Sequence, residues 1–513
     1  MAGLLLVALG LRLEGITFGL PALYHPDEPA YVLQALALEQ RLPQGLTFAD
    51  PPLFKYLLLA EYTATYALQR LLGTTRSTTD FIAEFHADPS LLYLEARVTS
   101  ALCGAATVAA TAALGQVLGG RRAGLLAAAL SSLTFLLVRE AHFGVNDALV
   151  TLLVTLGLVA CVRVTRGGGR LDSVLAGVLA GLAFAAKYYG IVLLVPLVLA
   201  HLWACRCPHT SRTNLVLSVI ACLLAAVVGF PSLLTEPARV GQDVYTHLYV
   251  AARTGYDGID TSGGYLFYVG ALGVGLGWPL LIAAFVGAVL LVQEHRRRRP
   301  ALVVAALPLV FLGVLGSQRL YFARFALPAV PVLIVIASLA LDRLMSVQRL
   351  VGGLAALLVA LPTGVDSVRF DAILNQADTR TLASTWIGTN LPPSASLAGD
   401  TPPFGPGLAS PGAVPPTDAV FDLSPAEYRM DGVEYLVVSS FTLEARAIDP
   451  TREARREAFG PELAGSATVV AQFRPYAGAA EPRFAYDQVY GPWTALDRLV
   501  GPGPTITIYR LTE

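Results

Sequence analysis

The chain has 513 residues, of which 55% are hydrophobic and only 14% are charged, and its formal net charge is −1. Soluble domains carry about 25% charged residues, so this composition excludes an ordinary soluble protein and predicts a polytopic membrane protein. A net charge near zero excludes a strong overall field as the means of attracting a partner. Nothing in the composition indicates binding to nucleic acid.

An apolar run over residues 4–20 opens the chain and gives way to an acidic pair, Asp27 and Glu28. The run has neither a basic start nor a small-residue cleavage site, which favours a retained first helix over a signal peptide. Such an abrupt change from apolar to acidic residues is typical of the membrane–water interface. Pro29 suits the first position of a helix and either carboxylate suits its cap, so we predict an interfacial helix over residues 30–42.

A second apolar stretch begins with the letters DPPLFKY at residues 50–56 and continues to residue 72. Because it contains Lys55, Glu61 and Gln69, a membrane span and a helix lying on the membrane surface both remain open. Lys55 suits an anchor at the interface in either arrangement.

The later apolar runs are bounded by arginine clusters, which set their orientation because cytoplasmic loops are rich in Lys and Arg. This rule puts the basic residues at 121–122, 163–170 and 295–299 in the cytoplasm. We expect about eleven spans, with the N-terminus in the cytoplasm and the residues from 366 onward outside. The clearest spans are expected at residues 98–118, 123–138, 148–162, 215–234, 266–292, 301–316, 326–341 and 350–365.

Residues 173–203 form one long apolar run with basic residues on both flanks. Because both flanks favour the cytoplasm, the run is expected to cross the membrane twice, as a hairpin. Lys187 lies at the expected turn, where a lysine is costly without a partner. A group of Cys and His residues follows with a spacing unlike that of a standard zinc finger, which favours a structural over a zinc-binding interpretation. The group consists of His201, Cys205, Cys207 and His209.

The composition changes after residue 366, where prolines and glycines become frequent and the apolar runs shorten. We predict an α-helical polytopic membrane domain over residues 1–365, followed by a small extracytoplasmic α/β domain over residues 366–513. A capped helix is expected at residues 378–390, and strands are expected at 433–438, 467–473 and 505–509. No residue of this second domain suggests catalysis.

The predicted topology gathers carboxylates, histidines and cations at the outer face of the membrane. A carboxylate can accept the proton of an attacking hydroxyl, and carboxylates with histidine can hold a divalent cation such as Mg, Mn or Zn. Lysine and arginine can stabilise a departing phosphate. Each residue also has a structural explanation, as a helix cap or as an anchor to lipid headgroups. The residues are Asp27, Glu28, Lys55, Arg97, His142, Asp147, Lys187, His247, Arg319 and Arg324.

The order of these features resembles the GT-C membrane glycosyltransferases, specifically the bacterial relatives of protein O-mannosyltransferases and of the lipid A aminoarabinose transferase. The acidic pair, the proline pair at 51–52, and the arginine and the aspartate that open later spans follow the order of that family. A Gly-Leu-Ala to Lys-Tyr element at 181–190, an aromatic-Arg-aromatic element with two prolines at 321–331, and a final Ile-Tyr-Arg-Leu at 508–511 extend the resemblance.

The resemblance implies transfer of a sugar from a polyprenyl-phosphate donor to a lipid, glycan or protein acceptor at the outer face of the cell membrane. We expect an inverting transferase with one direct displacement, in which Asp27 takes the proton of the acceptor. The pKa of a free aspartate is about 3.9, so Asp27 must rely on its position. The expected catalytic residues are Asp27, Glu28 and Asp147; the expected phosphate-binding residues are Lys55, Arg97, Lys187, Arg319 and Arg324; and the expected ligands of any divalent cation are Asp27, Asp147 and His247.

Two departures leave the sugar and the acceptor open. Residue 50 is aspartate, where many relatives have histidine and the aminoarabinose branch has lysine. The sequence also has no counterpart of the sugar-binding-like loop domain of the protein mannosyltransferases. A transporter or flippase of a lipid-linked saccharide is the alternative function. A non-catalytic assembly protein, whose second domain binds a partner, is the third.

Overall fold

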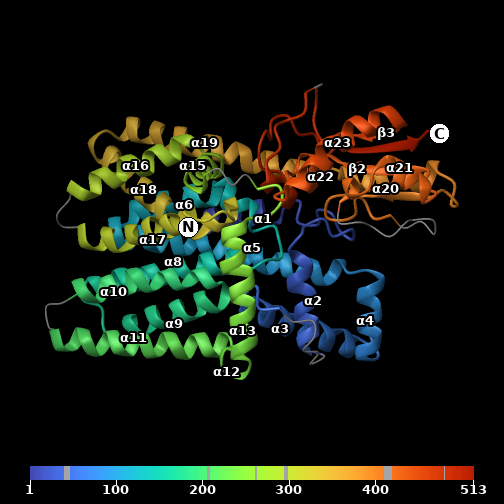
Figure 1. Cartoon of the computed structure of the whole chain (residues 1–513). Helices are drawn as coiled ribbons and strands as arrows, with labels where there is room; N and C mark the ends of the chain where they lie inside the picture. The colour runs from blue at the N-terminus through green and yellow to red at the C-terminus, as the bar shows by residue number, and fades with distance from the viewer. Residues whose placement is uncertain are drawn as a thin grey trace. The chain divides into compact units, whose positions relative to one another are not determined.

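The computed structural model describes residues 1–39, 47–204, 208–259, 263–293, 298–408, 419–478 and 480–512. The chain divides into two compact units (Figure 1). The first consists of Met1–Ile16, Ala30–Arg253 and Gly263–Val368, and the second of Thr17–Pro29, Thr254–Ser262 and Arg369–Glu513. The C-terminal part of the chain therefore folds together with two short segments from earlier in the sequence.

The first unit is a bundle of helices that carry apolar residues around most of their circumference. Its α-helices, of which α2, α14 and α19 have one end in a segment of the second unit, are α1 (Ala2–Leu13), α2 (Glu28–Glu39), α3 (Leu53–Leu72), α4 (Thr78–Ala87), α5 (Ser90–Gly119), α6 (Arg121–Leu133), α7 (Phe135–Arg139), α8 (Asp147–Thr165), α9 (Arg170–Ala186), α10 (Leu194–Trp203), α11 (Pro208–Gly229), α12 (Ser232–Thr235), α13 (Pro237–Val244), α14 (Ala251–Thr254), α15 (Gly264–Leu276), α16 (Trp278–Gln293), α17 (Arg298–Gly316), α18 (Val330–Val347) and α19 (Arg349–Leu374). Short 3₁₀ helices cover Tyr188–Leu193 and Ala323–Ala329, and a π-helical turn covers Tyr245–Val250.

Length and composition make six helices of the described residues suitable for crossing a membrane, or seven if α15 and α16 are one bent span. The six are Ser90–Gly119, Asp147–Thr165, Arg212–Gly229, Arg298–Gly316, Ala323–Val347 and Arg349–Asn390. Two shorter helices, Ala2–Leu13 and Tyr188–Trp203, are also apolar. The multi-pass helical architecture is confirmed, whereas the expected number of about eleven spans is not.

The expected span over residues 266–292 is not one straight helix, because the chain bends by 111° between α15 and α16. Gly277 stands at the bend with φ +79°, a left-handed conformation that glycine adopts without a steric penalty. Pro279 follows two residues later and has no backbone N–H to continue the hydrogen bonds of α15. The glycine and the proline together explain the break.

Two other boundaries differ from the sequence prediction. Helix α5 begins at Ser90, whose backbone N–H donates to the Asp88 carboxylate at 2.9 Å, so Arg97 lies two turns inside the helix instead of opening it. The polar segment between the expected spans at 215–234 and 266–292 is largely helical, because it folds into α12, α13, the π-helical turn and α14. Its apolar residues Val240, Val244 and Leu248 recur every four positions, which is the spacing of a helix face.

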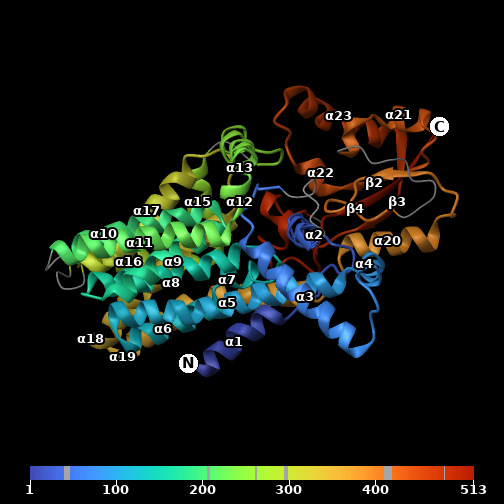
Figure 2. The ribbon, with the colours of Figure 1, turned by 90° about the horizontal axis from the view of Figure 1, so that it is seen from below.

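Helices α9 and α11 run side by side and approach each other through glycines (Figures 1 and 2). A Cβ atom on Gly177 would lie 2.1 Å from the Ser218 carbonyl oxygen, and one on Gly181 would lie 2.2 Å from that of Cys222. The two glycines are four residues apart, the small-residue spacing that lets membrane helices pack backbone to backbone. This contact fixes the position of α9, whose last residue, Ala186, is followed by Lys187.

A buried histidine links the same helices. The His201 side chain in α10 lies 3.2 Å from the Ser173 hydroxyl and 3.3 Å from the Ser218 hydroxyl, and the Ser218 hydroxyl donates to the Ser173 carbonyl at 2.7 Å. Polar contacts of this kind hold helices together inside a membrane. His201 thus fits the structural interpretation of its group, while Cys205 and Cys207, and the side chain of His209, lie outside the described residues.

The second unit contains a four-stranded sheet in the order β1-β2-β4-β3. The strands are β1 (Leu397–Gly399), β2 (Tyr435–Ser439), β3 (Ala467–Phe473) and β4 (Ile506–Leu511), and the helices are α20 (Thr379–Asn390), α21 (Pro425–Met430), α22 (Ser440–Glu444) and α23 (Pro450–Ser466). The first pair, β1 and β2, is parallel, and the other two pairs are antiparallel. The predicted helix at 378–390 and the three predicted strands are all present.

Helices cover both faces of this sheet (Figure 2). Leu436 and Val438 of β2 pack on one face with Phe459 and Leu463 of α23. On the other face Val437 of β2 joins a core cluster with α20. Successive residues of β2 thus point to opposite sides, and burial on both sides explains its continuous apolar run.

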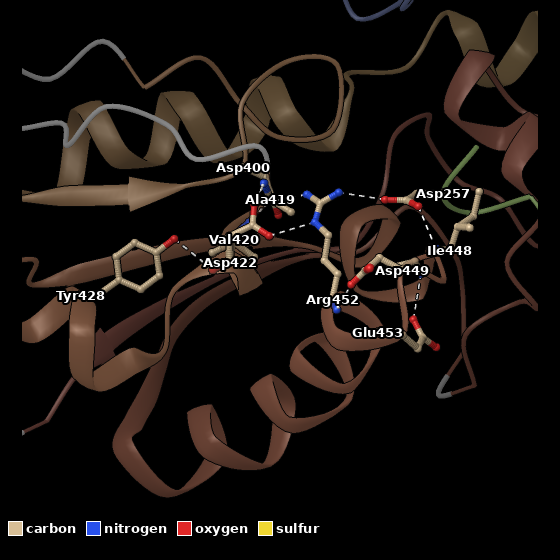
Figure 3. A network of polar contacts seen from close by, with 11 residues as sticks. Asp257, Asp400, Ala419, Val420, Asp422, Tyr428, Ile448, Asp449, Arg452 and Glu453 are labelled. Carbon is tan, nitrogen blue, oxygen red and sulfur yellow. Dashed lines mark hydrogen bonds and ion pairs between the residues drawn. The ribbon is translucent and has the colours of Figure 1, made fainter. Parts of the chain in front are cut away.

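A charged cluster attaches residues 254–259 to the sheet domain (Figure 3). The Arg452 guanidinium in α23 bonds the Asp257 carboxylate at 2.8 Å and the Asp422 carboxylate at 3.0 Å. The second oxygen of Asp257 accepts the Ile448 N–H at 2.8 Å. These bonds hold Asp257 as a member of the second unit.

We expect Gly177→Ala to destabilise the protein, because the new methyl group would overlap the backbone of α11. Overpacking of this kind typically costs about 1–3 kcal/mol. The matched control is Gly10→Ala in α1, where no atom lies within 4 Å of the added carbon. Thermal unfolding of both variants in the same detergent measures the difference, and an unchanged Tm for Gly177→Ala would contradict the close packing.

The buried Asp400 carboxyl should make the stability of the second unit depend on pH. Burial raises the pKa of Asp400 to about 6, although the carboxylate accepts the Ser439 and Val420 N–H groups. A raised pKa means that the folded state prefers the neutral acid, so stability is highest below the usual pKa and is lost as pH rises through about 6, by roughly 3 kcal/mol in all. Tm measured from pH 4 to pH 8 should fall less steeply for Asp400→Asn than for the wild type; equal slopes would refute the assignment.

Candidate active site

A buried ion pair lies at the centre of the first unit. The Lys187 ammonium bonds the Asp147 carboxylate at 2.8 Å, and the exposed fractions of the two side chains are 10% and 2%. The Tyr189 hydroxyl donates to the same carboxylate oxygen, also at 2.8 Å. One carboxylate oxygen therefore accepts two bonds, a strong arrangement in a poorly hydrated environment.

The local structure explains how these side chains meet. Asp147 is the first residue of α8, and Lys187 follows the last residue of α9, where the backbone is extended. Gly190 closes the 3₁₀ turn that follows: a Cβ there would lie 2.3 Å from the Ala183 carbonyl oxygen. The break that the sequence predicted at Lys187 is thus present, and the partner that the buried lysine requires is Asp147.

Aromatic rings and a second cation surround the pair. The Lys187 ammonium lies 5.3 Å from the ring centre of Tyr189 and 5.4 Å from that of Phe325. Arg324 is 6% exposed, and its guanidinium lies 4.3 Å from the ring centre of Phe322. Tyr189 and Phe325 are themselves 6.2 Å apart, edge to face. The segment around Arg324 therefore belongs to the same cluster as the ion pair.

A second carboxylate, Asp50, joins the cluster through Asn146. The Asn146 amide donates to the Ala186 carbonyl at 2.7 Å and to the Asp50 carboxylate at 3.4 Å. Lys55 is buried, and its ammonium donates to the Gln34 side chain at 2.7 Å and to the Asp50 carbonyl at 3.1 Å. Two carboxylates and three cations are thus gathered among α3, α8, α9 and the segment before α18.

The charges around Asp50 favour its ionised form. Burial by itself raises the pKa of Asp50, but the nearby charges of Lys187 and Lys55 act in the opposite direction. Hydrogen bonds from Tyr31 and Asn146 act in the same direction as the lysines. The net result is a pKa below the usual range of an aspartate, so this carboxylate is ionised at neutral pH.

The acidic pair predicted from the sequence belongs to the second unit. Glu28 is buried and is the first residue of α2, whereas Asp27, one residue earlier, is only partly buried. The His25 Nδ1 atom accepts the N–H groups of both residues at 3.3 Å. His25 therefore binds backbone N–H groups at the start of this helix.

The remaining predicted residues lie elsewhere. Arg97 is buried and donates to the Ile16 carbonyl at 2.8 Å, and His142 is buried between the carbonyls of Val138 and Glu14. Arg319 is exposed, and His247 is partly exposed in the π-helical turn. Within the described residues no group of three or more His, Cys, Asp or Glu side chains is arranged to hold a metal ion, so the expected ligands Asp27, Asp147 and His247 form no such group.

Sequence reasoning missed Asp50, Asn146 and Tyr189 as members of the cluster. A signal was present for two of them, because Asp50 precedes the proline pair and Tyr189 lies in the turn with Lys187. Asn146 gave no distinctive pattern, since an asparagine before a helix is ordinarily a cap. In the structure its side chain makes no capping bond and instead joins α8 to the end of α9.

An apolar cavity of about 440 Å³ lies among α15, α16, α17 and α18. Its wall is formed mainly by aliphatic side chains, with Tyr265 and Tyr268 at one end and Arg298 among the lining residues. The Tyr268 ring lies 6.5 Å from Tyr321, which is three residues before Arg324.

Comparison with known proteins agrees with the resemblance seen in the sequence. Residues 93–232 match the dolichyl-phosphate-mannose-protein mannosyltransferase family. Comparison with curated proteins gives no match.

Solved structures resemble nearly the whole chain. The structure of ArnT from Cupriavidus metallidurans bound to undecaprenyl phosphate is 18% identical, covers 92% of this chain and 96% of its own, and has a TM-score of 0.52. Its apo form is 16% identical, with coverages of 92% and 95% and a TM-score of 0.52. The oligosaccharyltransferase AglB from Archaeoglobus fulgidus, in complex with an inhibitory peptide and a dolichol-phosphate, is 13% identical, with coverages of 92% and 73% and a TM-score of 0.51. The chain thus has the fold of the GT-C membrane glycosyltransferases, and its residues 93–232 match the dolichyl-phosphate-mannose-protein mannosyltransferase family.

Proposed function

We propose that this protein is a glycosyltransferase that moves a sugar from a polyprenyl-phosphate donor to an acceptor hydroxyl or amine at the outer face of the membrane. The observation that carries the proposal is the buried cluster of Asp147, Lys187 and Arg324 in a chain with this fold. Ionisable residues inside a membrane protein are costly to bury and therefore mark functional sites. The undecaprenyl phosphate and dolichol-phosphate of the similar structures support a lipid phosphate as the donor group.

Cations meet a specific need of this reaction. The bond between the sugar C1 and the phosphate oxygen breaks, the acceptor atom bonds C1 from the opposite side, and the acceptor proton passes to a base. The donor is a phosphodiester with one negative charge, whereas the departing polyprenyl phosphate has two. Lys187 and Arg324 would stabilise this additional charge, which forms only as the bond breaks. The resemblance assigns the same role to Lys55, Arg97 and Arg319.

The pairing of Lys187 with Asp147 is compatible with this role. Asp147 holds the lysine side chain in position before the donor binds, which avoids reorganisation during the reaction. Asp50 adds a second negative charge beside the two lysines. A phosphate would therefore enter a site whose cations are already positioned.

The apolar cavity suits the lipid part of the donor. It is lined mainly by aliphatic side chains of α15–α18, and one of its lining residues, Tyr268, has its ring 6.5 Å from that of Tyr321. A polyprenyl chain is a branched hydrocarbon that gains free energy from burial at about 25 cal/mol per Å². We assign this cavity to the first isoprene units of the donor.

The base of the proposed reaction is Asp27, with Glu28 as a supporting carboxylate. Asp27 is partly buried and its backbone is held by His25, so the carboxylate starts from a fixed position. The resemblance allows a divalent cation, but Asp27, Asp147 and His247 form no metal-binding group among the described residues. The sugar and the class of acceptor stay open, because Asp50 departs from the residue of either branch of relatives.

The ion pair should be needed for turnover beyond its part in folding. Removing one partner of a buried pair, as in Lys187→Met, typically costs about 3–5 kcal/mol of stability. The double variant Asp147→Leu with Lys187→Met leaves no unpaired charge and should recover most of the wild-type Tm. Its release of polyprenyl phosphate should nevertheless remain at least about 100-fold below wild type. A double variant with wild-type turnover would remove the pair from the mechanism.

Asp27→Asn should abolish transfer without unfolding the protein, because the substitution keeps the size of a partly exposed side chain. A general base contributes about 10²- to 10⁴-fold to a rate, and the loss should lie in that range. Release of polyprenyl monophosphate is measured with purified protein in lipid, a panel of polyprenyl-phosphate sugars and bacterial lipid extract. Asp80→Asn in α4, at an exposed position, is the matched control. Movement of the donor across the bilayer without release in the wild type would support the flippase alternative.

A further inference from the structure

The segment that carries the acidic pair folds with the C-terminal domain. Residues 17–29 belong to the second unit, together with residues 369–513. Tyr24 is 2% exposed, its hydroxyl lies 2.9 Å from the Thr381 hydroxyl, and the Arg380 guanidinium lies 4.0 Å from its ring centre. Arg380 is in turn paired with Asp378 at 2.7 Å in a buried ion pair. The start of α20 therefore anchors the residues immediately before the acidic pair.

His25 continues this attachment up to the carboxylates. Its side chain is 2% exposed, and its ring lies 5.5 Å from that of Tyr490, edge to face. Its Nδ1 atom accepts the N–H groups of Asp27 and Glu28, so the ring proton is on Nε2. The imidazole thus connects the C-terminal domain to the two backbone groups that set the direction of both carboxylates.

We propose that the C-terminal domain is the scaffold that positions the acidic pair, and that His25 is the positioning residue through which it does so. The proposal rests on the proposed function, in which Asp27 is the base. It gives the C-terminal domain a task in the reaction. The His25 ring acts as a spacer between Tyr490 and the turn at Asp27, and its Nδ1 atom fixes that turn.

The experiment compares three substitutions of His25 in the full-length protein in lipid. In His25→Asn the Oδ1 atom stands near the position of Nδ1 and can accept the same N–H groups. In His25→Gln the polar atoms stand near the position of Nε2 instead, and in His25→Ala none is present. A fourth variant, Tyr490→Leu, removes the aromatic contact from the side of the C-terminal domain.

Two readouts are taken for each variant, kcat with KM for the donor and hydrogen exchange of a peptide covering residues 24–31. We expect His25→Ala and His25→Gln to lower kcat by about 10- to 100-fold with little change in KM, as misplacement of a catalytic group does. Exchange at Asp27 and Glu28 should rise in both variants. His25→Asn should restore both readouts, and Tyr490→Leu should shift both in the direction of His25→Ala.

The attachment of residues 254–259 provides the matched control, because it involves the same domain but not the acidic pair. Asp257→Asn weakens the bonds to Arg452 and should lower Tm while leaving kcat and exchange at 24–31 unchanged (Figure 3). An equal loss of kcat in Asp257→Asn would overturn the proposal in favour of general loosening. Restoration by His25→Gln rather than His25→Asn would overturn it in favour of direct contact through Nε2.

Hydrogen exchange separates this proposal from the function on which it rests. If Asp27→Asn keeps full turnover, the assignment of the base fails, while exchange at residues 24–31 still tests the attachment. If Asp27→Asn is inactive but exchange is unchanged in His25→Ala and Tyr490→Leu, the scaffold role fails and the function stands.

Discussion

The buried bond between Asp147 and Lys187 is the constraint on which the membrane unit depends. A lysine at the end of α9 is tolerated inside an apolar bundle only if an anion meets it, and the anion is provided by the first residue of α8. The bond therefore fixes the position of α8 relative to α9 along their axes. The chain itself joins these two helices only by a short loop. Tyr189 donates a further hydrogen bond to Asp147, and Asn146 links the end of α9 to Asp50.

Much of this arrangement follows from local patterns in the sequence, and the rest depends on contacts that have no local pattern. The helix after Asp378 and the strand at 467–473 were predictable because a cap and an apolar run with turn residues on both sides identify them. The break at Lys187 was predictable from charge bias alone. Helix α23 was missed although Asp449 caps it, because its many charged residues hid a narrow apolar face.

The sequence predictions that differ from the structure failed because sequence patterns describe only local properties of the chain. Hydropathy averages over a window and does not register the glycine and the proline at 277–279 that bend α15 away from α16. Arg97 was expected at a helix end because arginine commonly reaches lipid headgroups, but its guanidinium instead donates a hydrogen bond to the Ile16 carbonyl. Asp50 was noted as a departure from its relatives and not as a site residue, because its lysine partners lie 5 and 137 positions away in the sequence. The pairing with Lys187, 137 positions away, cannot be inferred from one sequence.

The glycine contact between α9 and α11 has a mechanical consequence for the bundle. At Gly177 and Gly181 the backbone of α9 contacts that of α11 without side chains between them. We therefore expect these two helices to move as one rigid pair. Helices α15–α18, in contrast, line an apolar cavity of about 440 Å³, so side chains there have space to move. If the proposed lipid donor enters this cavity, the close contact between α9 and α11 is expected to keep Lys187 in place while α15–α18 adjust to the lipid.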